Sequence, residues 1–339
     1  MDLTTTHETG QGGTELGAHP LTTKEGWVRF VAEQPCRPQP APNAGRRDPA
    51  EHERRKQARL TYLSDPITVH TPTIAEVIKD VRRLLILNRR QVSARRGLIV
   101  TGAAGTGKTT ALTQLGRTHE LGARLRCSVP GAHIPVVYLT LPPAATARML
   151  AVEFARFLGI PVTNRANLTD VTEAVCGVLC DTFCQLVLVD ELHNLSLRTR
   201  AGAEVSDQLK YFAERIPATF VYAGIDLEAN GLFAGIRGKQ IASRFATIET
   251  RPFAYATTAQ RGAWHSLIAT LEQALCLDRH APGMLVRHAG YLYQRTGGMI
   301  GSLSHLIRGA AIDAICDGTE KITKAHLEAV RLDHAATAA

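Results

Sequence analysis

The sequence predicts an α/β fold in which a five-stranded parallel sheet is covered by helices on both faces and is followed by an all-helical lid. Three observations support this prediction. Short apolar runs alternate with helical patterns, a glycine-rich turn follows the first run, and only helical patterns follow Pro252. Because 339 residues exceed what one compact core usually holds, we expect three parts. These are a flexible N-terminal arm at 1–60, an α/β domain at 61–251 and the helical lid at 252–334.

The first folded element should be a helix that begins near Thr71. Its apolar residues from Ile74 to Leu85 follow the spacing of one helix face, and Thr73 with Glu76 forms a plausible capping box. The expected strands are 98–101, 135–141, 185–189, 219–223 and 245–248. The expected helices are 109–121, 146–158, 169–184 and 204–215 in the α/β domain, and 257–276, 281–296, 301–316 and 323–332 in the lid.

Composition and charge narrow the class of protein. Hydrophobic residues make up 45% and charged residues 21%, which excludes a wholly disordered chain, a collagen-like repeat and a coiled-coil rod. No apolar run approaches the roughly 18 to 20 residues that span a bilayer, and the N-terminus has no signal-peptide pattern. We therefore expect a cytoplasmic protein without a membrane segment. The net charge of +8 favours a polyanionic partner.

The expected N-terminal arm is rich in Thr, Gly, Pro, Gln and charged residues, which offer little to bury. It nevertheless contains an apolar island made of Trp27, Val28, Phe30 and Val31. Two interpretations stay open for this island. It either becomes ordered when a partner binds, or it packs back on the folded domain.

A phosphate-binding loop follows the first expected strand. GAAGTGKT matches GxxxxGK[ST] and stands between a strand and a helix, where backbone N–H groups and a helix N-terminus can face anionic oxygens. In this motif Lys108 reaches the β and γ phosphates, and Thr109 is a ligand for Mg²⁺. The expected nucleotide-binding residues of the loop are Gly102, Ala103, Ala104, Gly105, Thr106, Gly107, Lys108, Thr109 and Thr110.

Two carboxylates complete the expected site at the end of the strand LVLVDE. Asp190 fits an outer-sphere Mg²⁺ role, and Glu191 fits the base that polarises the attacking water. Their alternative role is an acidic helix cap. This pair favours ATP hydrolysis over phosphoryl transfer to a small acceptor, with ATP and Mg²⁺ as the cofactors. His193 and Asn194 either couple the water site to the next helix or serve in capping and packing.

At these motifs the sequence resembles the AAA+ ATPases, which have a five-stranded core and a helical lid. Within them, LVLVDELHNL, RLTYLSDPITVHTPTIAEV and RTGGMIGSLSHLIRGAAIDAICDGTEKIT resemble the TniB/TnsC transposition ATPases, relatives of IstB, over about residues 57–332. The resemblance implies an ATP-dependent homo-oligomer that assembles on double-stranded target DNA. It also implies recruitment or activation of a DDE transposase of the TniA/TnsB kind, often with a TniQ-type adaptor.

The resemblance also assigns roles to residues outside the phosphate motifs. Arg244 in ASRF stands where many AAA+ proteins hold the arginine finger, and Arg237 is the competing candidate. After the strand 219–223, Gly224 and Ile225 stand where relatives often have the polar sensor-1 residue, with Asp226 as a substitute. Gly301 stands at the position of the sensor-2 arginine. Together, the two departures imply that hydrolysis is slow or is completed by a partner.

Basic residues offer several candidate DNA contacts without a base-reading module, so we expect binding with little sequence preference. One cluster without acidic residues consists of Arg82, Arg83, Arg89, Arg90, Arg95 and Arg96. A second cluster consists of Arg46, Arg47, Arg54, Arg55, Lys56 and Arg59, and the remaining candidates are Arg124, Arg126 and Arg148. A solvated helix face is the alternative for the first cluster. A helicase loader, a nucleotide-switch signalling ATPase and, less favoured, a P-loop small-molecule kinase remain the alternative functions.

Overall fold

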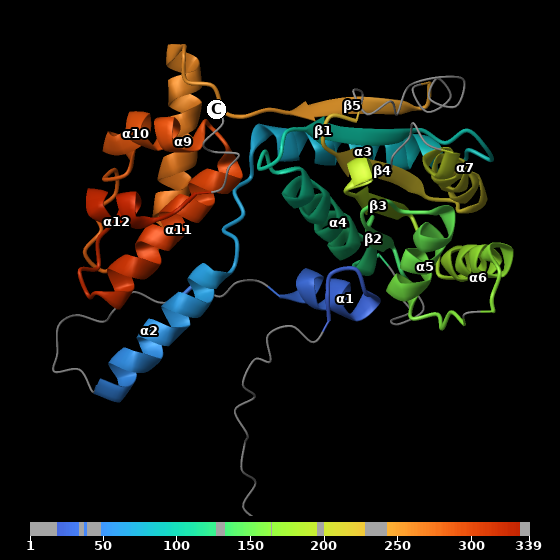
Figure 1. Ribbon diagram of the computed structural model, residues 1–339, viewed down its shortest axis with the longest axis horizontal. Helices are drawn as coiled ribbons and strands as arrows, with labels where there is room; N and C mark the ends of the chain where they lie inside the picture. The colour runs from blue at the N-terminus through green and yellow to red at the C-terminus, as the bar shows by residue number, and fades with distance from the viewer. Residues whose placement is uncertain are drawn as a thin grey trace, which may run out of the picture.

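The centre of the molecule is a parallel sheet of five strands in the order β2-β3-β4-β1-β5 (Figure 1). This computed structural model describes residues 19–33, 37–38, 49–126, 133–163, 165–194, 200–227 and 243–332. The strands are β1 Gly97–Gly102, β2 Val136–Thr140, β3 Leu186–Asp190, β4 Thr219–Gly224 and β5 Phe245–Thr250. The expected five-stranded parallel sheet is confirmed. All of its strands point the same way, so their carboxyl ends share one edge.

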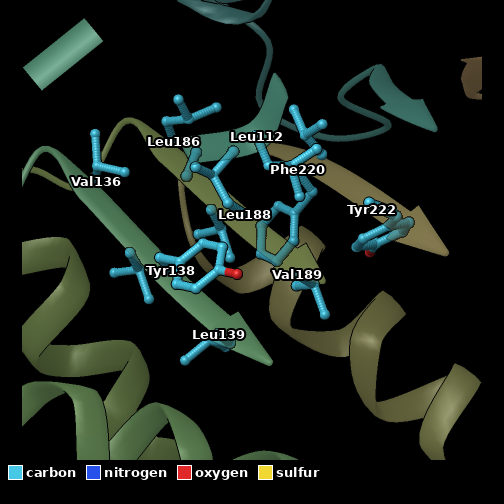
Figure 2. Packing of buried hydrophobic residues seen from close by; sticks show 14 of the residues in the cluster. Leu112, Val136, Tyr138, Leu139, Leu186, Leu188, Val189, Phe220 and Tyr222 are labelled. Carbon is cyan, nitrogen blue, oxygen red and sulfur yellow. The ribbon is translucent and has the colours of Figure 1, made fainter. Parts of the chain in front are cut away.

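The central strands are buried along their whole length. Each residue of β1, β3 and β4 is buried, as expected for parallel strands that are covered on both faces. Figure 2 shows Leu186, Leu188 and Val189 of β3 lying between Tyr138 of β2 and the side chains of β4. Continuous apolar runs therefore identify these strands in the sequence.

One helix before β1 and four helices between the strands complete the described part of this domain. They are α3 Pro72–Asn88, α4 Lys108–Arg124, α5 Ala147–Leu158, α6 Leu168–Asp181 and α7 Arg200–Arg215. The capping box expected at Thr73 and Glu76 is wrong. Thr71 is the N-cap instead, because its side chain accepts a hydrogen bond from the Ile74 N–H and Pro72 occupies the first turn.

The lid is an all-helical unit with its own core around Trp264 and Leu303. Its helices are α9 Thr258–Ala274, α10 Ala289–Thr296, α11 Ile300–Cys316 and α12 Lys324–Ala329. The helix expected at 281–296 is shorter, because the Glu272 carboxylate accepts hydrogen bonds from the N–H groups of Gly283 and Leu285 and fixes a turn there. Among the described residues, no helix is both long and apolar enough to cross a membrane.

The N-terminal region differs from the expected flexible arm. Its described part contains α1 Lys24–Ala32 and α2 Pro49–Ser64, which lie beside different parts of the molecule (Figure 1). Trp27 and Val31 are each 1% exposed in the core of the α/β domain, whereas Leu63 is fully buried in the lid core. Trp27, Phe30 and Val31 of the apolar island therefore pack back on the folded domain, whereas Val28 is 39% exposed. A few apolar residues are enough to hold these helices in place, because they are buried in the larger apolar cores of the α/β domain and the lid.

Arg59 anchors α2 to the lid through a buried ion pair. Its guanidinium contacts both Glu320 carboxylate oxygens at 2.6 and 2.9 Å and the Cys276 carbonyl at 3.2 Å. Arg59→Ala should lower the free energy of unfolding by about 3 kcal/mol, because it leaves Glu320 without its main partner. Chemical denaturation measures this change. Arg54→Ala, on the exposed side of α2, is the control and should keep the wild-type midpoint; equal midpoints for both variants would contradict the anchor.

Candidate functional site

The glycine-rich loop lies between β1 and α4, at the carboxyl edge of the sheet. Gly102, Gly105 and Gly107 have φ angles of 145°, 74° and 93°, in the region that favours glycine. A Cβ atom on Gly102 would lie 2.2 Å from the Thr250 carbonyl oxygen. The turn opens directly into the 17-residue helix α4, so backbone N–H groups and a helix N-terminus are available for anionic oxygens.

Lys108 is held by the backbone of its own loop. Its ammonium donates hydrogen bonds to the carbonyls of Gly102 at 2.9 Å and Ala103 at 2.7 Å, and the residue is only 7% exposed. Burial lowers the pKa of Lys108, and the nearby carboxylates of Asp190 and Glu191 oppose that shift. Among the described residues its hydrogen-bond partners are neutral carbonyls, which suits a cation that binds phosphate.

The Asp190 carboxylate accepts three hydrogen bonds from the described residues. Its Oδ1 accepts a hydrogen bond from the Glu191 N–H at 2.8 Å. Its Oδ2 accepts from the Thr109 hydroxyl at 2.7 Å and from the Tyr138 hydroxyl at 3.1 Å. The structure thus brings together Thr109 and Asp190, the two predicted metal ligands. Mg²⁺ prefers oxygen ligands, which the Thr109 hydroxyl and the Asp190 carboxylate supply, so these residues fit this ion.

Glu191 stands on a backbone conformation that non-glycine residues rarely adopt, with a φ of 59°. Its Oε2 lies 3.2 Å from His193 Nε2, and His193 Nδ1 accepts a hydrogen bond from the Ile225 N–H at 3.3 Å. His193 therefore links Glu191 to the residue that follows β4, whereas the coupling interpretation named the next helix. Asn194 instead donates to the Leu141 carbonyl at 2.8 Å, a packing role at the end of β2.

A cavity of about 380 Å³ joins the loop, Glu191 and the lid. Seven predicted residues of the loop line it, namely Ala104, Gly105, Thr106, Gly107, Lys108, Thr109 and Thr110. Gly102 and Ala103 lie behind them as acceptors for Lys108. Pro66, Ile67 and Val69 add an apolar wall from the segment before α3. The cavity thus combines an anion-binding end with an apolar wall, and a nucleotide fits this chemistry.

The lid meets the loop through Gly301. Its N–H donates to the Gly105 carbonyl at 3.0 Å, and a Cβ atom at 301 would lie 3.2 Å from that oxygen. A glycine at the expected sensor-2 position therefore allows this close approach. Sequence reasoning missed Arg308, which lines the cavity two helical turns further along α11 and bonds the Leu63 and Ser64 carbonyls. The seven-residue spacing from Gly301 was the signal, because it places both residues on one helix face.

Of the remaining finger and sensor candidates, Ile225 lines the cavity and Arg244 does not. Arg244 forms an ion pair with Glu214, whose pKa is lowered mainly by this hydrogen bond. Arg237, the competing finger, lies outside the described residues. Gly224 is too closely packed for a side chain, because a Cβ atom there would lie 2.6 Å from Leu227. Asp226 is exposed beyond β4, at a φ of 44°.

The basic clusters separate into free and engaged residues. In the first cluster Arg82, Arg89, Arg90 and Arg96 are exposed, whereas Arg83 pairs with Asp80 and Arg95 contacts backbone carbonyls near the end of α7. Two of the four described members of the second cluster hold α2 against the lid, since Arg55 binds Asp278 and Arg59 binds Glu320. Arg46 and Arg47 lie outside the described residues. Arg124 pairs with Glu120, Arg148 binds the Ala166 carbonyl, and Arg126 is exposed.

Solved structures share this architecture at low sequence identity. Aeropyrum pernix ORC1 in complex with DNA is 16% identical with a TM-score of 0.58, covering 79% of this chain and 65% of its own. The A. pernix ORC2 protein with ADPNP and ADP is 15% identical with a TM-score of 0.59, covering 77% and 67%. Drosophila ORC bound to DNA is 14% identical with a TM-score of 0.53, covering 90% and 71%. This chain thus spans about two thirds of these proteins, and the likeness concerns the fold.

The strand order, the loop between β1 and α4 and these neighbours define an AAA+ P-loop NTPase fold. The family model described as "Bacterial TniB protein" matches residues 59–255, more than half of the chain. The chain therefore belongs to the TniB family, as its resemblance at DELHN and the lid implied. No curated protein matches it.

Proposed function

We propose that this chain is a Mg²⁺-dependent ATPase that assembles on double-stranded DNA in its ATP state and recruits or activates a DDE transposase, with a TniQ-type adaptor as a further partner. The observation that carries this proposal is the cavity between the loop, Glu191 and the lid, in a chain of the TniB family. The family supports the transposition role, and the cavity supports the nucleotide.

The residues of the cavity divide the chemistry among them. Loop N–H groups and Lys108 hold the β and γ phosphates, while Thr109 and Asp190 hold Mg²⁺. The bound ion supplies charge neutralisation at the phosphates. Glu191, whose carboxylate is oriented by His193, accepts a proton from the attacking water. Lid contacts at Gly301 limit the access of bulk water to this edge.

The exposed arginines near the C-terminal end of α3 are our candidates for DNA contact. Arg82, Arg89 and Arg90 lie on or next to one helix, and none has an acidic partner among the described residues. A few phosphate contacts per subunit bind weakly, but a row of assembled subunits multiplies them. DNA affinity should therefore follow assembly.

Duplex DNA binding should require ATP and fall steeply with salt. Replacing both Arg82 and Arg89 by Ala should weaken binding and reduce the log–log salt slope by about 0.9 for each phosphate that the variant no longer neutralises. Fluorescence anisotropy over a salt series measures both quantities. Arg156→Ala is the control, because this exposed arginine on α5 pairs with Glu153.

Two outcomes would contradict this proposal. Equal binding with and without ATP, or no duplex binding at low salt, would remove the DNA scaffold and favour a nucleotide-switch signalling ATPase. A wild-type slope in the double variant would instead move the DNA contacts to another surface, with Arg126 as the next exposed candidate.

A further inference from the structure

The N-terminal helix α1 places an indole ring in the core of the α/β domain, which also contains the strands that lead into the proposed phosphate site. Trp27 is 1% exposed, and its Nε1 donates a hydrogen bond to Glu120 Oε2 on α4 at 2.5 Å. Gly116, one turn earlier on α4, makes room for this ring, because a Cβ atom there would lie 2.7 Å from Trp27. Arg117 adds a hydrogen bond to the Glu33 carbonyl at 2.6 Å. These contacts seat α1 on α4, the helix that begins at Lys108.

The indole also stacks on Tyr138 of β2. Their ring centroids are 5.7 Å apart and their planes are inclined by 15°. Figure 2 shows Tyr138 beside Leu188 and Val189 of the neighbouring strand, which ends at Asp190. Tyr138 is 4% exposed, so its ring is confined between α1 and the sheet.

Tyr138 carries this contact to the predicted metal ligand. Its hydroxyl donates to Asp190 Oδ2, the same oxygen that accepts the Thr109 hydroxyl. Burial is the main cause that raises the pKa of Tyr138, so the hydroxyl remains a proton donor at neutral pH. When Thr109 turns its oxygen toward an ion, Tyr138 is the side-chain donor that keeps Oδ2 in place. The Glu191 N–H alone then holds Oδ1.

We propose that Tyr138 is a positioning residue for Asp190, and that α1, through Trp27, holds Tyr138 in place and so sets the affinity of the site for Mg²⁺. This inference rests on the proposed ATPase function and adds a regulatory element to it. A partner or a change that lifts α1 from α4 would weaken the site without touching the nucleotide loop. Such outer partners of metal ligands commonly change metal affinity by about 10 to 100-fold.

The test is a Mg²⁺ titration of fluorescent ATP binding, which requires no hydrolysis, followed by the same titration of turnover. Tyr138→Phe removes only the hydroxyl and should raise the Mg²⁺ midpoint about tenfold. Trp27→Ala should raise it in the same direction, and Trp27→Phe, which keeps a ring on Tyr138, should recover most of the loss. In a Tyr138→Phe background Trp27→Ala should add little, because both changes act through one contact.

Val31→Ala is the matched control, since Val31 is equally buried on α1 but carries no ring that could stack on Tyr138. An equal midpoint shift in Val31→Ala and Trp27→Ala would show general destabilisation and overturn the inference. Should Trp27→Ala fail to fold, Glu120→Gln weakens the indole bond and takes its place. Wild-type midpoints in all variants, with normal binding and turnover in the wild type, would overturn this inference alone. A wild-type chain that binds no nucleotide would overturn the proposed function as well.

Discussion

Glu191→Gln should bind ATP as the wild type does but hydrolyse it about 10² to 10⁴-fold more slowly. An amide keeps the shape of the side chain and can still accept the hydrogen bond from His193, whose Nε2 lies 3.2 Å from the carboxylate. It cannot accept a proton from water. Steady-state phosphate release measures the rate, and equilibrium binding of a fluorescent nucleotide measures the affinity.

Two further variants make this result specific. Lys108→Ala should lose nucleotide binding itself, because it removes the buried ammonium beside the loop carbonyls. Glu249→Gln changes an exposed carboxylate on β5 that pairs with Arg251, and it should hydrolyse ATP at the wild-type rate. If Glu191→Gln turned over ATP as fast as Glu249→Gln, Glu191 would not be the base.

The sheet and the phosphate loop could be predicted because the information is local. Gly102 to Thr109 is one continuous segment, and the apolar run before Asp190 identifies a strand that is buried on both faces. The edge shared by the parallel strands then brings the loop and Asp190 together without any long-range assumption. Thr109 and Asp190, 81 residues apart, meet for this reason.

The docking of the N-terminal helices could not be predicted in the same way. Trp27 and Glu120 are 93 residues apart, and Arg59 and Glu320 are 261 residues apart. Composition shows that this segment has too few apolar residues for a core of its own, but it does not show the surface that receives them. The sequence of a polar segment therefore predicts a flexible arm unless the surface on which the segment packs is known. Tyr138 was missed similarly, because it lies on β2 and its hydroxyl meets Asp190 only through the pairing of β2 with β3.

The position of Arg244 excludes a role at the cavity of its own chain. Its carbonyl accepts the Gly97 N–H at 3.0 Å, at the start of β1, whereas the loop follows Gly102 at the other end. A strand of this length spans about 17 Å, which is more than an arginine side chain reaches. Its ion pair with Glu214 is partly exposed and holds it by about 1 kcal/mol or less, so assembly can break it.

Mixing Arg244→Ala subunits with Glu191→Gln subunits should therefore restore ATP hydrolysis that neither variant shows alone. Arg244→Ala keeps an intact loop and base but lacks the finger, while Glu191→Gln binds ATP and presents Arg244 to its neighbour. In a random equimolar head-to-tail assembly, roughly a quarter of the wild-type rate should return, since half of the subunits keep the base and half of those have a neighbour with the finger. A finger contributes about 10³ to 10⁵ in rate, so recovery is measurable against either variant alone. Arg215→Ala, an exposed arginine that pairs with Glu173, is the control and should keep the wild-type rate unmixed. No recovery in mixtures that co-assemble by light scattering would exclude Arg244 as the finger and leave Arg237 as the candidate.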